Sequence, residues 1–237
     1  MSTVRIERRF RGPPESGNGG YVAGLVAAAL GGSECTVTLR APPPLDSDLM
    51  LETDGAAATL FQGDSVVVTA SKAPLEIDVP PPPTLAEAQD AEPRFAGHSD
   101  HIFPGCFVCG PERGAGDGMR IFPGELHDRN RRVAATWTPD ETVTDEKGFV
   151  RPEFLWAALD CPGYFAAGAD AGMALLGRMS AVIHRPTRAG DPLIVTGWPI
   201  DSEGRKHRVG CALHDANGEL VAAATATWIT LNEAQAA

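Results

Sequence analysis

The amino-acid sequence predicts an α+β protein made of two similar halves. Four consecutive prolines at 80–83 mark a break between the halves, because a proline run favours an extended path and continues neither a helix nor a central strand. On each side of this break, one short apolar segment is followed by several segments with the composition of strands. Such a set suits a central helix wrapped by a curved antiparallel sheet, since helix and sheet can bury their apolar faces against each other.

The expected elements follow the same order in both halves. In the first half, the segment YVAGLVAAAL at 21–30 is almost wholly apolar and predicts a buried helix. In the second half, the apolar segment 153–169 predicts another helix, with Pro162 as a kink or break. The expected strands are 35–40, 49–53, 57–61 and 65–71 in the first half, and 179–184, 193–199, 208–214 and 220–231 in the second.

Two pairs of segments indicate an internal repeat. Residues 39–48 share their layout with residues 183–191, and residues 62–70 share theirs with residues 217–225, where a turn precedes a long strand. A single α+β domain in which this similarity is accidental is the alternative. The expected boundaries are 1–88 for the first half, 89–104 for the linker and 105–237 for the second half.

Composition and charge restrict the partners and the location. The chain has 237 residues and a formal net charge of −11, which disfavours nucleic acid, whose phosphates need clusters of Lys and Arg. A small anionic ligand stays compatible, because a local basic patch can oppose the overall sign. The first ten residues lack the apolar region of a signal peptide, and no apolar run approaches the roughly 20 residues of a membrane span. With five cysteines, an odd number that suits reduced thiols, the sequence predicts a cytoplasmic protein without a membrane partner.

Short motifs along the chain resemble the hotdog superfamily of thioesterases and dehydratases. Residues 16–29 (SGNGGYVAGLVAAA) are similar to the start of the central helix in thioesterase II proteins, which are double hotdogs and open this helix with a Gly-Gly pair. Residues 155–165 (LWAALDCPGYF) resemble the same helix of phenylacetate-pathway-type thioesterases, in which a mid-helix Asp is catalytic. CFVCGP at 106–111 and GDGMRI at 116–121 resemble a motif that often precedes the first hotdog strand, and HRP at 184–186 is again similar to thioesterase II. The resemblance implies a double hotdog and hydrolysis of an acyl-CoA thioester.

Asp160 is the first candidate for catalysis. It is a carboxylate in an otherwise apolar segment, where burial without a partner or a purpose is costly. In the thioesterases that the segment resembles, such an Asp acts as a nucleophile or as a general base for the attacking water. Burial also raises the pKa of a carboxyl group, which makes its carboxylate a stronger base. The alternative is a structural Asp that caps a helix end near the break at Pro162 or makes another structural hydrogen bond.

Asn18, Gly19 and Gly20 are the second candidate. Unpaired backbone N–H groups at a helix start can stabilise a developing oxyanion, and glycine allows a close approach. The same groups could bind an anion or a carbonyl without catalysis, or form a plain glycine-rich turn with Asn18 as N-cap.

The two halves divide these candidates between them. Seven residues beyond Gly20 lies Ala27, whereas seven residues before Asp160 lies Glu153, where the resembled family has glycine. The first half therefore keeps the glycines and the second half keeps the acid. We expect one working site per chain, built from Asn18–Gly20 and Asp160, while the mirror-related site has lost both parts.

Other positions depart from the resembled families. Thioesterase II proteins combine their Asp with a Thr and a Gln, but the corresponding positions fall near Leu176 and Ala226. Hydratases of this superfamily place a His five residues after the Asp, where this chain has Phe165. These departures weaken the dehydratase interpretation and favour, as the alternative function, a non-catalytic module that binds an acyl or CoA-like ligand.

Cys106 and Cys109 have the CxxC spacing of a zinc knuckle or a redox pair. With His98 and His101 just upstream they could form a Cys2His2 set, but the spacing is not that of a zinc finger, and the family resemblance explains the motif without metal. We therefore expect no metal and no cofactor. Cys161 has no His beside it in the sequence and is interpreted as a small buried thiol.

For the ligand, we expect Arg120, Arg185 and Tyr164 to bind substrate. Arginines suit the phosphates of coenzyme A, and the basic run 129–132 is a further candidate, although a solvated turn is its commoner explanation. The sequence leaves the acyl group open. It also leaves open whether the chain is a monomeric pseudo-dimer or forms a homo-oligomer, since sheet edges can pair further.

Overall fold

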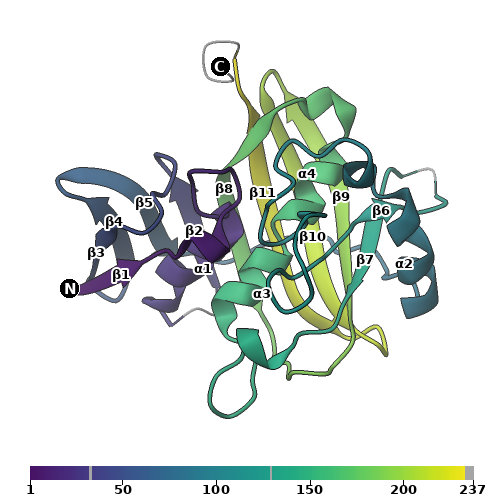
Figure 1. Ribbon diagram of the computed structural model, residues 1–237, viewed down its shortest axis with the longest axis horizontal. Coiled ribbons are helices and arrows are strands. Elements are labelled where there is room, and N and C mark those ends of the chain that lie inside the picture. Colours follow the sequence, from purple (N-terminus) through teal and green to yellow (C-terminus); the bar gives the residue numbers. More distant parts are fainter. Residues whose placement is uncertain (32–33, 129, 233–237) are drawn as a thin grey trace.

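The computed structural model describes residues 1–31, 34–128 and 130–232. Its framework is one antiparallel sheet of eleven strands in the order β1-β3-β4-β5-β2-β8-β11-β10-β9-β7-β6, with the helices packed on one face (Figure 1). The strands are β1 (Ser2–Arg5), β2 (Glu34–Leu39), β3 (Asp48–Thr53), β4 (Ala57–Gln62), β5 (Ser65–Lys72), β6 (Gly124–Glu125), β7 (Val133–Trp137), β8 (Ala174–Ile183), β9 (Leu193–Glu203), β10 (Lys206–Asp215) and β11 (Leu220–Thr230). The α-helices are α1 (Gly19–Ala28), α2 (Leu85–Ala91), α3 (Pro152–Ala158) and α4 (Cys161–Ala167).

The strand order is mirrored about the pair β2–β8. Moving outward from the centre, β2, β5, β4 and β3 on one side match β8, β11, β10 and β9 on the other, and each set follows the same succession of hairpins. The central strands pair antiparallel from Glu34↔Val182 to Thr38↔Arg178. The hydroxyl groups of Thr36 and Ser180 lie 2.8 Å apart across this pair. The sheet therefore continues from one part of the chain into the other by ordinary ladder hydrogen bonds.

Helices from the two parts of the chain pack against each other. α1 consists of small and apolar residues, GGYVAGLVAA, so it is buried on nearly all sides and packs chiefly against α3. α4 packs on β9 and β10. The predicted helix 153–169 is in fact two helices, because the backbone breaks at Leu159 and Asp160 and Pro162 lies in the first turn of α4.

The predicted strands are present, several of them longer than expected. β8 begins at Ala174 rather than at residue 179, and β9 runs on to Glu203. β1, β6 and β7, which the sequence reading missed, form the outer strands of the sheet.

The segment around the predicted linker 89–104 also carries regular structure. α2 begins at a capping box made by Thr84 and Glu87 and packs on β7 and β9 through Ala88 and Ala91. Short turns follow, and residues 99–121 then run without regular strands over the helices. Phe107 anchors this loop, since its N–H donates to the carbonyl of Arg11 and its own carbonyl accepts from Met119.

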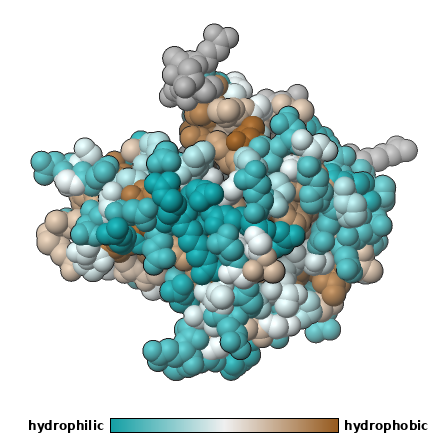
Figure 2. All heavy atoms as spheres, in the orientation of Figure 1, coloured by the Kyte–Doolittle hydropathy of each residue, from teal (hydrophilic) through white to brown (hydrophobic). Residues whose placement is uncertain are grey.

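Within the described residues, no helix combines the length and the apolar character that crossing a membrane requires. Seen from the side of Figure 1, most of the surface is hydrophilic, and hydrophobic residues gather at the upper end, near the ends of β8 and β11 (Figure 2).

Candidate active site

Asp160 lies in the break between α3 and α4 and is only 1% exposed. Its side chain makes no capping hydrogen bond to α4, so the structure disfavours the capping alternative. Instead, Oδ2 accepts two hydrogen bonds of 2.9 Å from the start of α1, one from Nδ2 of Asn18 and one from the backbone N–H of Gly20. Residues that are 140 and 142 positions apart in the sequence are thus joined in one polar cluster.

Asn18 serves both helices because its amide has two ends. Oδ1 caps α1 by accepting from the N–H of Tyr21 at 2.9 Å, and this leaves Nδ2 free to donate to Asp160. Asn18 is buried and its own N–H donates to the carbonyl of Phe10, so its position is fixed from three directions. A capping Ser or Asp would accept from the helix but would have no amide to offer the carboxylate.

Gly20 allows the two helices to approach closely. A Cβ atom at this position would lie 2.5 Å from Cβ of Asp160 and 2.7 Å from the carbonyl oxygen of Trp156. Backbone and Cβ atoms cannot rotate away, so any side chain at residue 20 would push α3 outward.

The carboxyl group of Asp160 is desolvated, and only one of its two oxygens accepts hydrogen bonds from the described residues. Burial raises its pKa to about 7, although the hydrogen bonds from Gly20 and Asn18 oppose this shift. Oδ1 is buried and has no hydrogen-bond partner among the described residues. This oxygen has the character of a proton acceptor that awaits a ligand or a water molecule.

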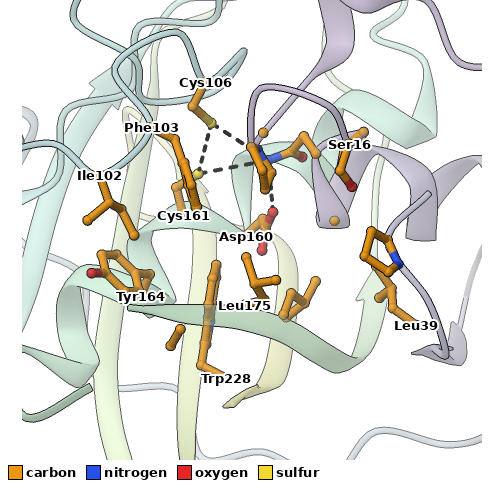
Figure 3. Close-up of a pocket in the computed structure, with 18 of the residues that line it drawn as sticks. Ser16, Leu39, Ile102, Phe103, Cys106, Asp160, Cys161, Tyr164, Leu175 and Trp228 are labelled. Carbon is orange, nitrogen blue, oxygen red and sulfur yellow. Dashed lines mark hydrogen bonds between the residues drawn. The ribbon is translucent and has the colours of Figure 1, made fainter. Parts of the chain in front are cut away.

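A pocket of about 890 Å³ opens beside Asp160. Its walls are mostly apolar and include residues of β8 and β11 as well as Tyr164 and Phe165 of α4 (Figure 3). The opposite side is formed by the turn 12–19 before and at the start of α1 and by the segment 39–43 after β2. A pocket of this size with few polar groups suits a small organic ligand.

Gly19 and Gly20 differ in what their N–H groups can do. The Gly20 N–H donates to Asp160, so it is not free to meet an oxyanion while this bond exists. Gly19 lines the pocket, and among the described residues none accepts a hydrogen bond from its N–H. The geometry thus moves the candidate oxyanion donor from Gly20 to Gly19.

Of the three predicted substrate-binding residues, one lines the pocket and two do not. Tyr164 lines the pocket and donates its hydroxyl hydrogen to the carbonyl of Gly172. Arg120 lies over the ring of Phe122 and Arg185 pairs with Asp215 at 2.7 Å, and neither lines the pocket. The structure therefore does not bring these two arginines to Asp160.

Two other arginines, Arg40 and Arg205, line the pocket and are exposed. No motif in the sequence distinguishes them, and only the course of β2 and of the β9–β10 turn brings them there. Within the basic run 129–132, Arg129 lies outside the described residues, whereas Arg132 pairs with Asp128 at 2.5 Å.

The predicted mirror-related site has no acid where the second half has Asp160. Ala27 is fully buried and offers no titratable group. Glu153 forms an ion pair with Arg151, whose Nε lies 3.4 Å from Oε1, and does not line the pocket. The single working site that the sequence predicts stays a prediction.

The cysteines are arranged differently from the sequence-based expectation. Cys161, interpreted as a small buried thiol, is buried, but it also lies beside the CxxC pair, with its Sγ 3.8 Å from Sγ of Cys106. Cys109 completes the cluster, and Nε2 of His101 lies 3.2 Å from its sulfur. His98 is turned toward the backbone of Glu92 instead, so a set made of both histidines and the CxxC pair does not form.

No protein-family model matches the chain, and no curated protein matches its sequence. Solved structures nevertheless match nearly all of it. A thioesterase candidate from Novosphingobium aromaticivorans superposes with a TM-score of 0.62 at 12% identity, over 97% of this chain and 95% of the other. A thioesterase II candidate from Thermobifida fusca gives 0.61 at 16% identity, over 98% and 93%.

A third match names the fold itself. A protein of unknown function with a hot dog fold, from Alicyclobacillus acidocaldarius, superposes with a TM-score of 0.60 at 13% identity, over 97% of this chain and 92% of the other. At such identities the likeness establishes the fold rather than the reaction. The chain has a hotdog fold, as its short motifs predicted.

Proposed function

We propose that the chain is a thioester hydrolase that acts on an acyl-CoA-like substrate, with Asp160 as general base or nucleophile. The observation that carries the proposal is the unpartnered Oδ1 of Asp160, a buried carboxylate oxygen of a residue that lines a mostly apolar pocket of about 890 Å³. An acyl chain would occupy the apolar part. The exposed guanidinium groups of Arg40 and Arg205 would meet the anionic part of the ligand.

The reaction needs few groups, and this cluster offers them. With Asp160 as base, Oδ1 takes a proton from water while the water oxygen attacks the thioester carbonyl carbon. The N–H of Gly19 would stabilise the negative charge that develops on the carbonyl oxygen. The C–S bond then breaks, and the leaving thiolate takes the proton back from Asp160. With Asp160 as nucleophile, its carboxylate attacks the thioester carbonyl carbon, the C–S bond breaks and the thiolate leaves. Water then hydrolyses the acyl anhydride, which regenerates the Asp160 carboxylate and supplies the proton that the thiolate takes up.

We also propose that the fold is a double hotdog, with units at 1–88 and 105–237 joined through 89–104. The mirrored strand order about β2–β8 supports this division, as does the placement of one helix or helix pair before each set of four strands. In this arrangement the site is shared, because Asn18–Gly20 come from one unit and Asp160 from the other.

The second candidate is a non-catalytic module that binds an acyl or CoA-like ligand. One observation favours it: Leu176 lines the pocket and Ala226 is buried, where thioesterase II would have a hydroxyl and an amide group. Such a module would hold the same ligand without cleaving it.

The deciding experiment is thiol release from a panel of acyl-CoA substrates of different chain length. We expect Asp160→Asn to lower turnover by about 10²–10⁴-fold, since it removes the proton acceptor but keeps size and hydrogen-bonding capacity. Glu153→Gln is the matched control, because Glu153 is the other buried carboxylate in the described part of the chain and lies outside the pocket. Its turnover should be unchanged. Equal thiol release by Asp160→Asn and the wild type would rule out Asp160 as base or nucleophile. Ligand binding without thiol release by the wild type would instead establish the module.

A further inference from the structure

Three cysteines from two distant segments meet beside Asp160. Cys106 and Cys109 belong to the loop 99–121, and Cys161 is the first residue of α4. Their Sγ atoms all lie within 4.8 Å of one another, and those of Cys106 and Cys161 are 3.8 Å apart (Figure 3). A tetrahedral Zn²⁺ with Zn–S bonds of about 2.3 Å holds its sulfurs about 3.8 Å apart. A disulfide would need about 2.05 Å.

The CxxC segment has the form of a metal-binding knuckle. The turn closes with a hydrogen bond of 2.9 Å from the Gly110 N–H to the carbonyl of Cys106. A Cβ at Gly110 would lie 2.5 Å from that oxygen, so the turn requires glycine after the second cysteine.

The groups around the cluster are donors that point at sulfur. The Phe103 N–H donates to Nδ1 of His101 at 3.0 Å, so Nε2 carries the hydrogen and donates to the sulfur of Cys109. Nδ2 of Asn18 lies 3.9 Å from Sγ of Cys106 and 4.0 Å from Sγ of Cys161. Donors of this kind stabilise thiolates, and buried thiolates so close together need a cation between them.

We propose that Cys106, Cys109 and Cys161 bind a Zn²⁺ ion as thiolates, with a water molecule at the fourth position. All three cysteines line the pocket, so the fourth position faces it. His101 orients the Cys109 thiolate and is not a ligand in this geometry. On binding, the thiols release their protons to solvent.

The ion would tie the loop 99–121 to the start of α4. This loop has no strand to hold it over the helices, and Cys161 directly follows Asp160. A fixed Cys161 also fixes the backbone that carries the carboxylate. The proposal does not depend on thioester hydrolysis, because metal content is measured without substrate.

The test uses the full chain, purified without a polyhistidine tag. We expect about one zinc ion per chain by elemental mass spectrometry, and reloading of the stripped protein in competition with a chromophoric chelator. Co²⁺ in place of zinc should give the intense thiolate-to-cobalt charge-transfer absorption. Removal of the zinc should speed the alkylation of Cys106, Cys109 and Cys161, whereas Cys35 and Cys211, which are also buried, should react at the same slow rate with and without the metal.

Variants assign the ligands. Cys106→Ser and Cys161→Ser should each lower the affinity for zinc at least tenfold. Cys35→Ser and Cys211→Ser, which also replace buried cysteines, should leave the affinity unchanged. The absence of zinc and of the cobalt charge-transfer band in the wild type would overturn the proposal, even if the serine variants do not fold. Undiminished zinc in a folded Cys161→Ser, or a Cys106–Cys161 disulfide in the isolated protein, would overturn it as well.

Discussion

The two helical regions at the centre of the molecule bury opposite kinds of polar group. α1 is an unbroken helix of ten residues without a charged side chain, and its start presents an N-cap amide and two glycine N–H groups. The corresponding region in the second part is two helices of seven residues, α3 and α4, with a carboxylate at the break between them. The positive end of one helix therefore faces the negative group of the other. Neither region could therefore hold its polar groups in the interior alone.

The largest effect should come from giving α1 an acid of its own. Ala27 is fully buried and has no donor prepared for a carboxylate, so Ala27→Asp should lower the free energy of unfolding by about 4 kcal/mol or more. The neighbouring Ala28 is exposed, so Ala28→Asp should cost about 1 kcal/mol at most. Denaturant unfolding measures both. Similar losses for the two variants would show that the two helical regions do not differ in this way.

The next effect concerns the contact between the regions. Gly20→Ala should destabilise the protein by about 3 kcal/mol, because the new Cβ meets Cβ of Asp160 and the backbone of Trp156. Gly114→Ala is the control, since no described atom lies within 4 Å of a Cβ at that position. Its midpoint of denaturant unfolding should not fall below that of the wild type. If Gly20→Ala matched the control, the close approach of α1 and α3 would be wrong.

A smaller effect is expected at the cap of α1. Asn18→Ala removes the cap and one of the two donors to Asp160, which together should cost about 2 kcal/mol. Turnover of the proposed reaction should fall as well. Thr84→Ala removes the cap of α2, far from the pocket, and should cost about 1 kcal/mol with turnover unchanged. Thermal unfolding and thiol release separate the two roles, and equal turnover in both variants would reduce Asn18 to a helix cap.

Much of the fold could be predicted from local patterns, because each element carries its own signal. The apolar run at 21–30 marks α1, and Pro162 marks the break before α4. α2 was missed because the prolines at 80–83 suggested a linker, although Thr84 and Glu87 form a recognisable capping box three residues apart.

The candidate site shows where prediction from sequence ends. The resemblance brought Asn18, Gly20 and Asp160 together, and the structure joins them by hydrogen bonds. It could not show that the Gly20 N–H is occupied by the carboxylate, since that depends on the crossing of two helices. Arg185 looked suitable for a phosphate but is neutralised by Asp215, which is distant in sequence. The meeting of Cys161 with Cys106 spans 55 residues, and no spacing rule reports such a contact.

The ladder between β2 and β8 has a consequence for how the protein behaves on dilution. Two separate subunits that shared a site of this kind would lose it as they dissociate, and their activity would follow concentration. Here both contributors are segments of one polypeptide, so their local concentration is set by the chain itself. Because the two parts are linked, they need not resemble each other, and one part supplies the hydrogen-bond donors while the other supplies the acid.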